Sequence, residues 1–244
     1  MEKNDFVFGT RAVIEAVKTG KTIEKVLIKK GLNNHLFHEL FQLLKEYKVL
    51  YQFVPVEKLN RITRKNHQGI VALLSPVEFH NIELLLPNLF ETGVDPFILI
   101  LDQVTDVRNF GAIVRTAECA GVQAIIIPEK GSAHIGGDAV KTSAGAIHHV
   151  PICRVENLLD SIHFLKNSGL KIFASSEKSN NLYTSKKYNV PLAIIMGSEE
   201  KGISPKILEH ADEMIKIPVN GKIESLNVSV SAAIVMYEVV RQRN

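Results

Sequence analysis

Apolar residues in the first 75 positions recur with two spacings, one typical of helices and one typical of strands. Val13, Ile14 and Val17 share one face of a helix that Gly20 ends. Leucines between 36 and 44 repeat the helical spacing. Shorter apolar runs predict strands at 25–28, 50–54 and 69–74, with a short helix at 56–62. This order predicts a small α/β sandwich over residues 1–75.

From Pro96 onward, apolar runs of strand length alternate with helical patterns. The predicted strands lie at 97–101, 124–127, 149–153, 170–174, 192–196 and 214–217. The predicted helices lie at 112–120, 138–144, 155–167, 205–210 and 228–241. This alternation indicates an α/β domain over 96–244 whose mostly parallel sheet carries helices on both faces. Residues 76–95, with two prolines, a short helical stretch and Gly93, are predicted to link the two domains.

The composition is that of an ordinary globular protein. Of the 244 residues, 45% are hydrophobic and 23% are charged, which leaves room for a real core. No apolar run approaches the roughly 18 residues of a membrane span, and the first residues lack the apolar segment of a signal peptide. We therefore expect a cytoplasmic protein. Cys119 and Cys153 form no paired motif, so reduced thiols are expected.

Positive charge is concentrated in the N-terminal part. Residues 1–75 hold 13 Lys/Arg and 7 Asp/Glu, whereas the rest holds 16 and 19. A basic bias of this kind favours a polyanionic partner, nucleic acid first, although lysines that only decorate a surface would give the same count. One loop before the last predicted strand is a candidate for phosphate contacts, and its RNA-binding candidates are Arg61, Arg64, Lys65, His67 and Gln68. The alternative is an exposed loop that binds nothing.

Three short motifs follow one another in the C-terminal part. They read NFGAIVRTA at 109–117, IMGSEEKGIS at 195–204 and SLNVS at 225–229. In this order and at this spacing they resemble the three motifs of the SpoU/TrmH family of RNA 2′-O-ribose methyltransferases. The resemblance covers roughly residues 96–241, and more weakly the N-terminal part, which is similar to the ribosomal-protein-like RNA-binding domain of many TrmH-type enzymes. It also implies a deep trefoil knot, which no periodicity argument would suggest because knots are so rare.

The resemblance implies S-adenosylmethionine as cofactor, held in the knot crevice mainly by backbone groups. The residues that this places at the cofactor are Ala174, Ser175, Gly197, Ile217 and Leu226. A glycine lets the backbone approach a ligand closely, and two aliphatic side chains can sandwich an adenine. Taken singly, Ile217 and Leu226 would read as ordinary core residues.

The resemblance also implies a set of catalytic residues, namely Asn109, Arg115, Glu199, Ser225 and Asn227. Asn109 could instead be a helix cap. Arg115 stands in an apolar stretch, and a buried arginine needs an anionic partner, for which an RNA phosphate would serve. Family proposals make this arginine the general base, but deprotonating an ordinary guanidinium near pH 7 costs roughly 7 kcal/mol. We therefore expect Arg115 to hold phosphate and polarise the acceptor, unless its pKa is strongly depressed.

Other chemistries fit the sequence less well. The spacing of Gly197, Gly202 and Ser204 is that of a phosphate-binding loop, but Ile203 stands where such a loop has lysine. A dinucleotide fingerprint is absent. His148 and His149 lack a third ligand at metal spacing, so no metal is expected. A serine hydrolase is disfavoured, because Lys141 stands where a nucleophile elbow at Ser143 would need glycine.

The resulting hypothesis is a methyltransferase that acts on a ribose 2′-hydroxyl of structured RNA. The resemblance is greatest to the members that methylate a guanosine of 23S ribosomal RNA, and transfer RNA is the alternative substrate. A non-catalytic RNA-binding or ribosome-assembly protein on the same scaffold is the second class. The family also implies a homodimer that packs the C-terminal helix, whose Val235, Met236, Val239 and Val240 make it apolar over more than one stripe.

Overall fold

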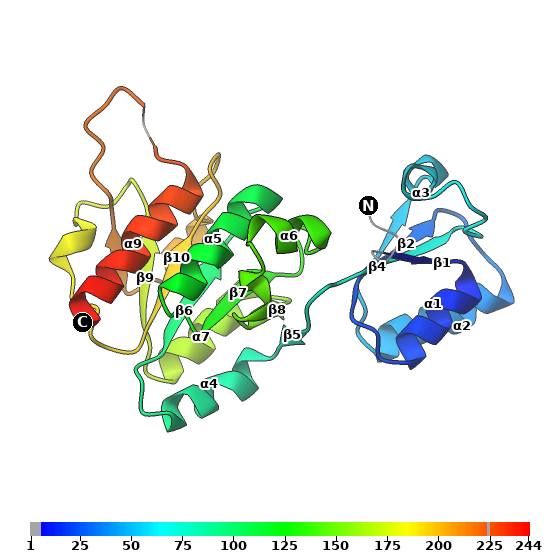
Figure 1. Cartoon of the computed structure of the whole chain (residues 1–244), viewed down its shortest axis with the longest axis horizontal. Coiled ribbons are helices and arrows are strands. Elements are labelled where there is room, and N and C mark those ends of the chain that lie inside the picture. The colour runs from blue at the N-terminus through cyan, green and yellow to red at the C-terminus, as the bar shows by residue number, and fades with distance from the viewer. Residues whose placement is uncertain (1–5, 224) are drawn as a thin grey trace. The chain divides into compact units, whose positions relative to one another are not determined.

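The computed structural model describes residues 6–223 and 225–244. It divides into two compact units (Figure 1). The smaller unit holds residues 6–78 together with 135–137, and the larger unit holds 79–134 and 138–244.

The smaller unit is an α/β sandwich built on a four-stranded sheet. Its strands are β1 (Phe6–Phe8), β2 (Ile23–Lys29), β3 (Tyr51–Val54) and β4 (Ile70–Leu74), in the order β1-β4-β2-β3. Helices α1 (Thr10–Lys18) and α2 (His35–Glu46) share one core with Val26, Ile28, Ile70 and Ala72. Alternate residues of the same strands, including Leu27 and Val71, pack on the other face with Leu59 of α3 (Val56–Ile62). The predicted sandwich is confirmed.

The larger unit contains a seven-stranded sheet in which every paired strand is parallel. Its strands are β5 (Phe79–His80), β6 (Phe97–Leu101), β7 (Ala124–Pro128), β8 (Ile152–Val155), β9 (Lys171–Ser175), β10 (Leu192–Met196) and β11 (Glu213–Ile215). Their order is β11-β9-β10-β6-β7-β8-β5. The central strands β6, β7 and β10 are buried along their whole length, as expected for a parallel sheet covered on both faces.

Two groups of helices cover the two faces of this sheet. Helices α4 (Ile82–Glu91), α7 (Leu158–Asn167) and α8 (Pro205–Leu208) share a core with alternate strand residues such as Ile98 and Ile195. Helices α5 (Val107–Cys119) and α9 (Val228–Arg243) lie side by side on the opposite face (Figure 1). The helix α6 (Gly137–Thr142) and two short 3-10 helices at 146–148 and 183–185 complete the described elements. The predicted α/β class is thus confirmed. Among the described residues, no helix combines the length and apolar character that a membrane span needs.

Several boundaries differ from the sequence-based expectation: the strand predicted at 149–153, for example, is β8 at Ile152–Val155. Two larger differences have clear causes. Most of residues 76–95, predicted as a linker, belongs to the larger unit, because β5 pairs with β8 and the apolar face of α4 buries Ile82 and Leu86 in the sheet core. Helix α5 begins at Val107 instead of residue 112, because the Asp106 carboxylate accepts hydrogen bonds from the backbone N–H groups of Arg108 and Asn109 at 2.8 and 3.0 Å. These N–H groups, with Asn109 the larger cause, hold the pKa of Asp106 below its usual value.

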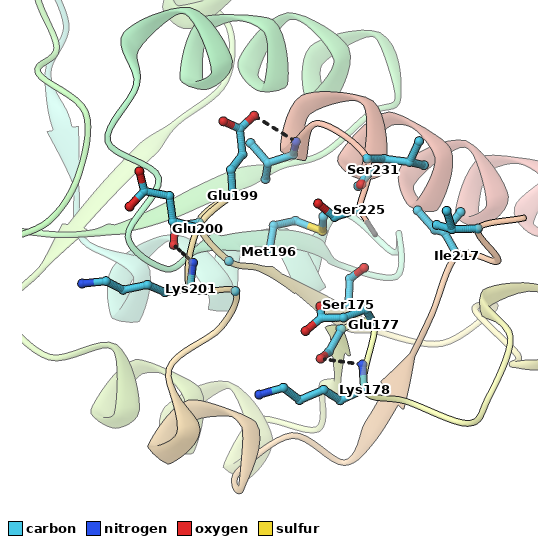
Figure 2. Close-up of a pocket in the computed structure, with 17 residues that line it drawn as sticks. Ser175, Glu177, Lys178, Met196, Glu199, Glu200, Lys201, Ile217, Ser225 and Ser231 are labelled. Carbon is cyan, nitrogen blue, oxygen red and sulfur yellow. Dashed lines mark hydrogen bonds between the residues drawn. The ribbon is translucent and has the colours of Figure 1, made fainter. Parts of the chain in front are cut away.

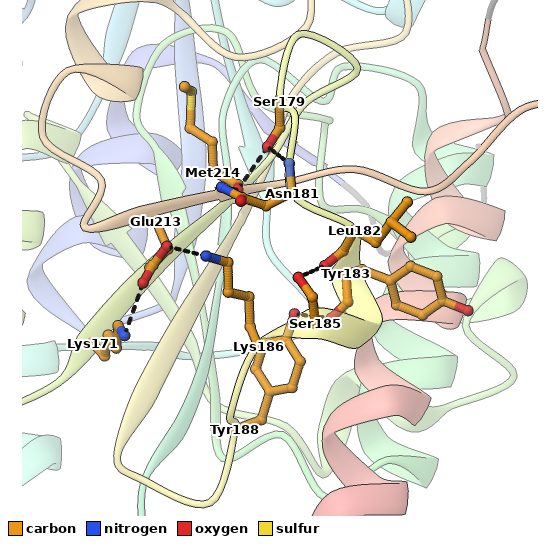
Figure 3. Close-up of polar contacts among 10 residues, drawn as sticks. All are labelled: Lys171, Ser179, Asn181, Leu182, Tyr183, Ser185, Lys186, Tyr188, Glu213 and Met214. Atoms are coloured by element: carbon orange, nitrogen blue, oxygen red, sulfur yellow. Dashed lines mark hydrogen bonds and ion pairs between the residues drawn. The ribbon is translucent and has the colours of Figure 1, made fainter.

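The segment after β9 is fastened to β11 and to Lys216, the residue after that strand; Figure 3 shows the contacts with Glu213 and Met214. Ser179 Oγ donates to the carbonyl of Met214 at 2.7 Å, and the backbones of Asn181 and Tyr183 pair with Lys216. Glu213 forms ion pairs with Lys186 at 2.7 Å and with Lys171 at 3.2 Å. Hydrogen bonds from these two lysines lower the pKa of Glu213. The edge strand β11 is therefore held from both sides.

The end of α9 is fastened to the same segment. Gln242 Nε2 donates to the carbonyl of Lys186 at 2.9 Å, and its Oε1 accepts from the backbone of Tyr188 at 3.0 Å. The Arg243 guanidinium donates to three backbone carbonyls, those of Asp95, Tyr188 and Val190. These contacts anchor the C-terminal end of α9, the end opposite to its start at Val228. The trefoil knot implied by the resemblance stays a prediction.

Candidate functional site

A pocket of about 350 Å³ opens beside the carboxyl ends of β9 and β10 (Figure 2). Ser175 and Met196 come from the ends of these strands, and residues 197–202 form the loop after β10. Ile217 and Leu226 come from the segment between β11 and α9. The carboxyl ends of parallel strands meet at one edge of the sheet, which is where ligands of open α/β sheets bind. We call this the first pocket.

Gly197 cannot carry a side chain in this loop. A Cβ atom there would lie 2.1 Å from the carbonyl carbon of Gly202 and 2.3 Å from the backbone nitrogen of Ile203. The loop closes on itself through Ser198 and Gly202, whose backbones exchange hydrogen bonds of 3.1 and 2.9 Å. The sequence suggested that the lack of a side chain at Gly197 makes room for a ligand. In the structure it also makes room for the backbone of Gly202 and Ile203 in the same loop.

The Glu199 carboxylate joins the three sequence motifs. Its Oε1 atom accepts a hydrogen bond from Asn109 Nδ2 at 2.9 Å, from Asn227 Nδ2 at closer range, and from the backbone N–H of Val228 at 3.4 Å. Asn227 Nδ2 also donates to Asn109 Oδ1 at 3.1 Å. Residues 90 and 28 positions away along the chain therefore meet at one oxygen atom. We call Glu199, Asn109 and Asn227 the triad.

The remaining atoms of Asn227 cap helix α9. Its Oδ1 accepts from the backbone N–H groups of Ser229 and Val230 at 2.9 and 3.3 Å and from Ser229 Oγ at 2.6 Å. One side chain thus starts the C-terminal helix and attaches that start to the loop after β10. Asn109 is not a helix cap, because Asp106 takes that position and frees the Asn109 side chain for the triad.

A second contact fixes the loop after β10 to the end of β6. Buried Asp102 accepts a hydrogen bond from the backbone of Ser204 at 2.7 Å, and Gln103 Nε2 donates to Ser204 Oγ at 2.9 Å. Asp102, Gln103 and Asp106 were not predicted from the sequence, although polar residues directly after a buried strand are a usable signal for residues at this edge of a sheet.

A second pocket of about 610 Å³ adjoins the first. It is lined by residues 103–106, Asn109, Lys130 and Gly131 on one side, and by Val228 and residues 198–201 on the other. Residues 198–201 and Val228 line both pockets. The two pockets therefore share a wall, and Glu199 stands in that wall. This arrangement can bring two ligands to opposite sides of one short loop.

Most residues predicted at a cofactor line the first pocket. Ser175, Gly197, Ile217 and Leu226 do so, as do Ser225 and Glu199 from the predicted catalytic set. Ala174 does not: it is fully buried in the core shared with α7, because successive strand residues point to opposite faces of the sheet.

Arg115 lies away from both pockets. It is exposed on α5, and it is not among the residues that line either pocket. The expectation of a buried arginine was therefore wrong. Phe110, Ile113, Val114 and Ala117 follow the helical spacing of three and four and form the buried stripe of α5, which turns Arg115 outward.

The predicted RNA-binding residues lie in the last turn of α3, which holds Arg61, and in the loop after it, which we call together the basic loop; they divide into exposed cations and residues that shape the loop. Arg61, Arg64 and Lys65 are exposed. His67 is largely buried, with Nε2 2.9 Å from Asn60 Oδ1 and Nδ1 accepting from the backbone of Gly69 at 3.0 Å. Gln68 Oε1 accepts from the backbone of Thr10 at 3.2 Å. The side chains of His67 and Gln68 therefore hold the loop in place, and their contact with RNA stays a prediction.

No metal centre is evident in the part of the chain that the structure describes, where no three His, Cys, Asp or Glu side chains are grouped to hold an ion. Of the two cysteines, Cys119 is exposed and Cys153 is buried, and burial raises the pKa of the Cys153 thiol to about 12.

Comparison with known families gives two matches. Residues 96–237 match the SpoU rRNA Methylase family. Residues 6–80 match a family described as RNA 2′-O ribose methyltransferase substrate binding. Together they span both units of the chain.

Similar proteins are found among both curated sequences and solved structures. YacO of Bacillus subtilis, assigned to the TrmH family of tRNA/rRNA methyltransferases, is 34% identical over 243 residues, which cover 100% of this chain and 98% of YacO. The TrmH/SpoU tRNA modifying enzyme of A. aeolicus is 33% identical, with a TM-score of 0.56 over 66% of this chain and 84% of that one. The SpoU methyltransferase AviRb of Streptomyces viridochromogenes is 22% identical, with a TM-score of 0.61 over 98% and 89%, and shares the fold.

The contact at Gly197 predicts a specific loss of stability. Gly197→Ala should lower the free energy of unfolding by about 1–3 kcal/mol, because backbone atoms must move to admit the methyl group. Gly221→Ala is the matched control, since nothing lies within 4 Å of its Cβ position and its φ is not positive. Urea unfolding followed by circular dichroism measures both. Equal midpoints for the two variants would contradict the tight loop.

The triad predicts energetic coupling between distant positions. In a double-mutant cycle, Glu199→Ala and Asn227→Ala should be non-additive by about 0.5–3 kcal/mol, because either change removes their shared hydrogen bond. Glu200→Ala combined with Asn227→Ala is the control, since Glu200 is exposed and no hydrogen bond joins these two side chains. Additive effects in the Glu199 cycle would show that the triad contact carries no free energy.

Proposed function

This chain belongs to the SpoU rRNA Methylase family, and from that membership we propose that it methylates a ribose 2′-hydroxyl of RNA with S-adenosylmethionine as methyl donor. The observation that carries the proposal is the triad, which joins all three family motifs through Glu199, its one member that lines both pockets. The proposed reaction needs a donor methyl group and an acceptor oxygen in direct contact, so the two ligands would meet where the two pockets adjoin.

The first pocket is proposed to take the methyl donor. Ile217 and Leu226 offer apolar surface for an adenine, and Ser175, Ser225 and the backbone of Gly197 offer polar groups. When bound, the cofactor supplies an electrophilic methyl group on a sulfonium. The residues of this pocket hold and orient it, and the compact loop around Gly197 keeps the wall in a fixed position.

The second pocket is proposed to take the acceptor nucleotide. With the cofactor bound, the ribose 2′-oxygen would take the methyl group as the sulfur–methyl bond breaks, and the hydroxyl proton would pass to solvent water. Asn109 lines this pocket and is a positioning residue here, because Glu199 fixes its amide. Asn227 lines neither pocket and acts through Glu199, to which it attaches the start of α9. Precise placement of acceptor and donor is a large part of catalysis in any two-substrate transfer.

We propose that the chain forms a homodimer and that Arg115 acts at the site of the partner subunit. Arg115 is exposed and lies outside both pockets, so it can serve a pocket in a partner subunit. Helix α9, which packs beside α5, also presents apolar side chains to solvent, with Val230 47% and Tyr237 49% exposed. Val235, Met236 and Val239 are buried within the chain itself, so the dimer face is formed by the other side of α9. In this homodimer, Arg115 holds a phosphate beside the target ribose of its partner.

The RNA is proposed to be ribosomal, with a guanosine of 23S rRNA as the target and transfer RNA as the alternative. Arg61, Arg64 and Lys65 supply phosphate contacts from the smaller unit, whose sequence matches a substrate-binding family. The rival function, a non-catalytic RNA-binding protein on the same fold, has no use for a first pocket that binds S-adenosylmethionine. Cofactor binding therefore separates the two.

The cofactor proposal predicts direct binding by the full chain. Isothermal titration should show one S-adenosylmethionine per chain, and Gly197→Glu should abolish it because the new side chain has no space beside Gly202. Gly221→Glu, in open surroundings, should bind as the wild type does. Absence of heat at millimolar cofactor with a folded wild-type sample would refute the methyltransferase proposal.

The role of Arg115 predicts a catalytic defect without a binding defect. Arg115→Ala should lower methyl transfer to unmodified ribosomal RNA by about 10²–10⁴-fold while keeping cofactor affinity. Arg108→Ala, an 83% exposed arginine on the same helix, is the control. Mixed dimers of Arg115→Ala with Gly197→Glu should recover activity, since the intact pocket then receives the partner's intact arginine. If subunit exchange does not restore activity, Arg115 acts in the site of its own chain. If Arg115→Ala is fully active, Arg115 has no role in the mechanism.

A further inference from the structure

Aromatic side chains form a cluster at one edge of the smaller unit, outside the basic loop. Tyr51 and Phe53 lie on β3, one of the two edge strands of the sheet, and project to the same side because they are two positions apart. Phe37 and Phe41 of α2 complete the cluster. Tyr51 is 38% and Phe53 42% exposed, which is unusual for neighbouring large aromatic residues. We call these four residues the aromatic edge.

The rings of the aromatic edge hold one another in place. Tyr51 meets Phe41 at 5.1 Å and 70° and Phe53 at 5.9 Å and 81°, both edge-to-face arrangements. Phe41 stacks on Phe37 at 5.5 Å, and Phe37 is buried in the core. The two exposed rings are thus packed against a buried base while part of their surface stays open to solvent. A rigid, exposed ring loses little conformational entropy when a flat ligand stacks on it.

Positive charge surrounds this cluster. Residues 29–54 hold four lysines and two glutamates, and one of these acids, Glu39, forms an ion pair with Lys18. Lys45 Nζ lies 4.6 Å from the centre of the Phe41 ring. Lys29 pairs with Val54 in the strand register, and exposed Lys48 precedes β3. The surroundings suit an anionic ligand that also presents flat apolar faces.

We propose that the aromatic edge binds unpaired bases of the RNA substrate by stacking. The inference rests on the proposed function, because it concerns how that substrate is held. Aromatic side chains with neighbouring cations are the usual means of binding single-stranded RNA, since every base has a face to stack and every nucleotide a phosphate to neutralise. In the basic loop, Lys65 Nζ lies 6.0 Å from the centre of the Phe8 ring, and Phe8 is less exposed than Tyr51 or Phe53.

A protein partner fits the same surface less well. The free side of β3 could accept a further strand, but lysines flanking an edge strand discourage strand pairing. Protein interfaces are also depleted in lysine at their centre, whereas Lys45 sits over the cluster itself. Aromatic rings framed by lysines therefore favour RNA.

A single tryptophan can report stacking directly, because the chain has none. Tyr51→Trp should lose fluorescence in a saturable way when titrated with a 12-nucleotide oligouridine, and should change little with a fully paired RNA duplex of the same length. Phe90→Trp, at a 39% exposed aromatic position on α4 of the larger unit, is the control and should not respond. A Tyr51→Trp signal that ignores oligouridine, or that follows the duplex equally, would overturn the proposal.

Replacing the rings separates stacking from charge. Tyr51→Leu with Phe53→Leu keeps apolar bulk, and should weaken oligouridine binding about tenfold or more while leaving the salt dependence of binding unchanged. Arg61→Ala, Arg64→Ala and Lys65→Ala together should instead flatten that salt dependence. Circular dichroism checks the fold, and a Tyr51→Phe variant should bind as the wild type does. Oligouridine affinity that survives the leucine pair overturns the proposal.

The remaining outcomes are also decisive. If the leucine pair alters the oligomeric state in light scattering while RNA affinity is kept, the aromatic edge is a protein interface and the proposal is wrong. Cofactor titration of the same variant should match the wild type. Failure of cofactor binding in the wild type would refute the methyltransferase proposal but leave the oligouridine result readable, so the two inferences fail separately.

Discussion

One carboxylate oxygen, Oε1 of Glu199, determines how the site of this protein is assembled. It accepts from Asn109, Asn227 and the backbone of Val228, and so connects the start of α5, the loop after β10 and the start of α9. Each of these segments is a helix end or a loop, where backbone groups are otherwise free to move. Hydrogen bonds to a charged acceptor are stronger than neutral ones, which makes a single carboxylate effective at joining three such segments.

The parallel sheet makes this junction geometrically possible. Because β6 and β10 are adjacent and parallel, the loops that follow them emerge at the same edge, where Asp102 accepts from the backbone of Ser204. The C-terminal segment reaches this edge from β11 and then starts α9 at Asn227. At the other end of α9, Gln242 and Arg243 bind the segment after β9, so the helix is fixed at both ends. The walls of the first pocket are therefore held by contacts far from the ligand.

The two units supply different kinds of interaction to the proposed RNA substrate. In the larger unit, polar groups fixed by short hydrogen bonds surround two adjoining pockets, which suits placement of individual reacting atoms. The smaller unit presents long exposed cations at Arg61, Arg64 and Lys65 and exposed rings at Tyr51 and Phe53. Phosphate contacts weaken steeply with salt, whereas stacking does not depend on counterion release. Using both would keep substrate affinity over a wider range of ionic conditions.

The sequence by itself determined the architecture of each unit and the identity of the motifs. Strand and helix periods are local properties of the chain, so the sandwich and the parallel α/β unit could be predicted. The helical spacing of the apolar residues in α5 likewise places Arg115 on the exposed face. Three other features were decided only by tertiary structure. Residues 79–91 belong to the larger unit because β5 pairs with β8 and α4 packs on the sheet core. The side chain of Ala174 faces away from the pocket because successive strand residues point to opposite faces of the sheet. The meeting of Asn109, Glu199 and Asn227 depends on strand order and on where α9 begins, since contacts between residues 90 positions apart leave no period in the sequence.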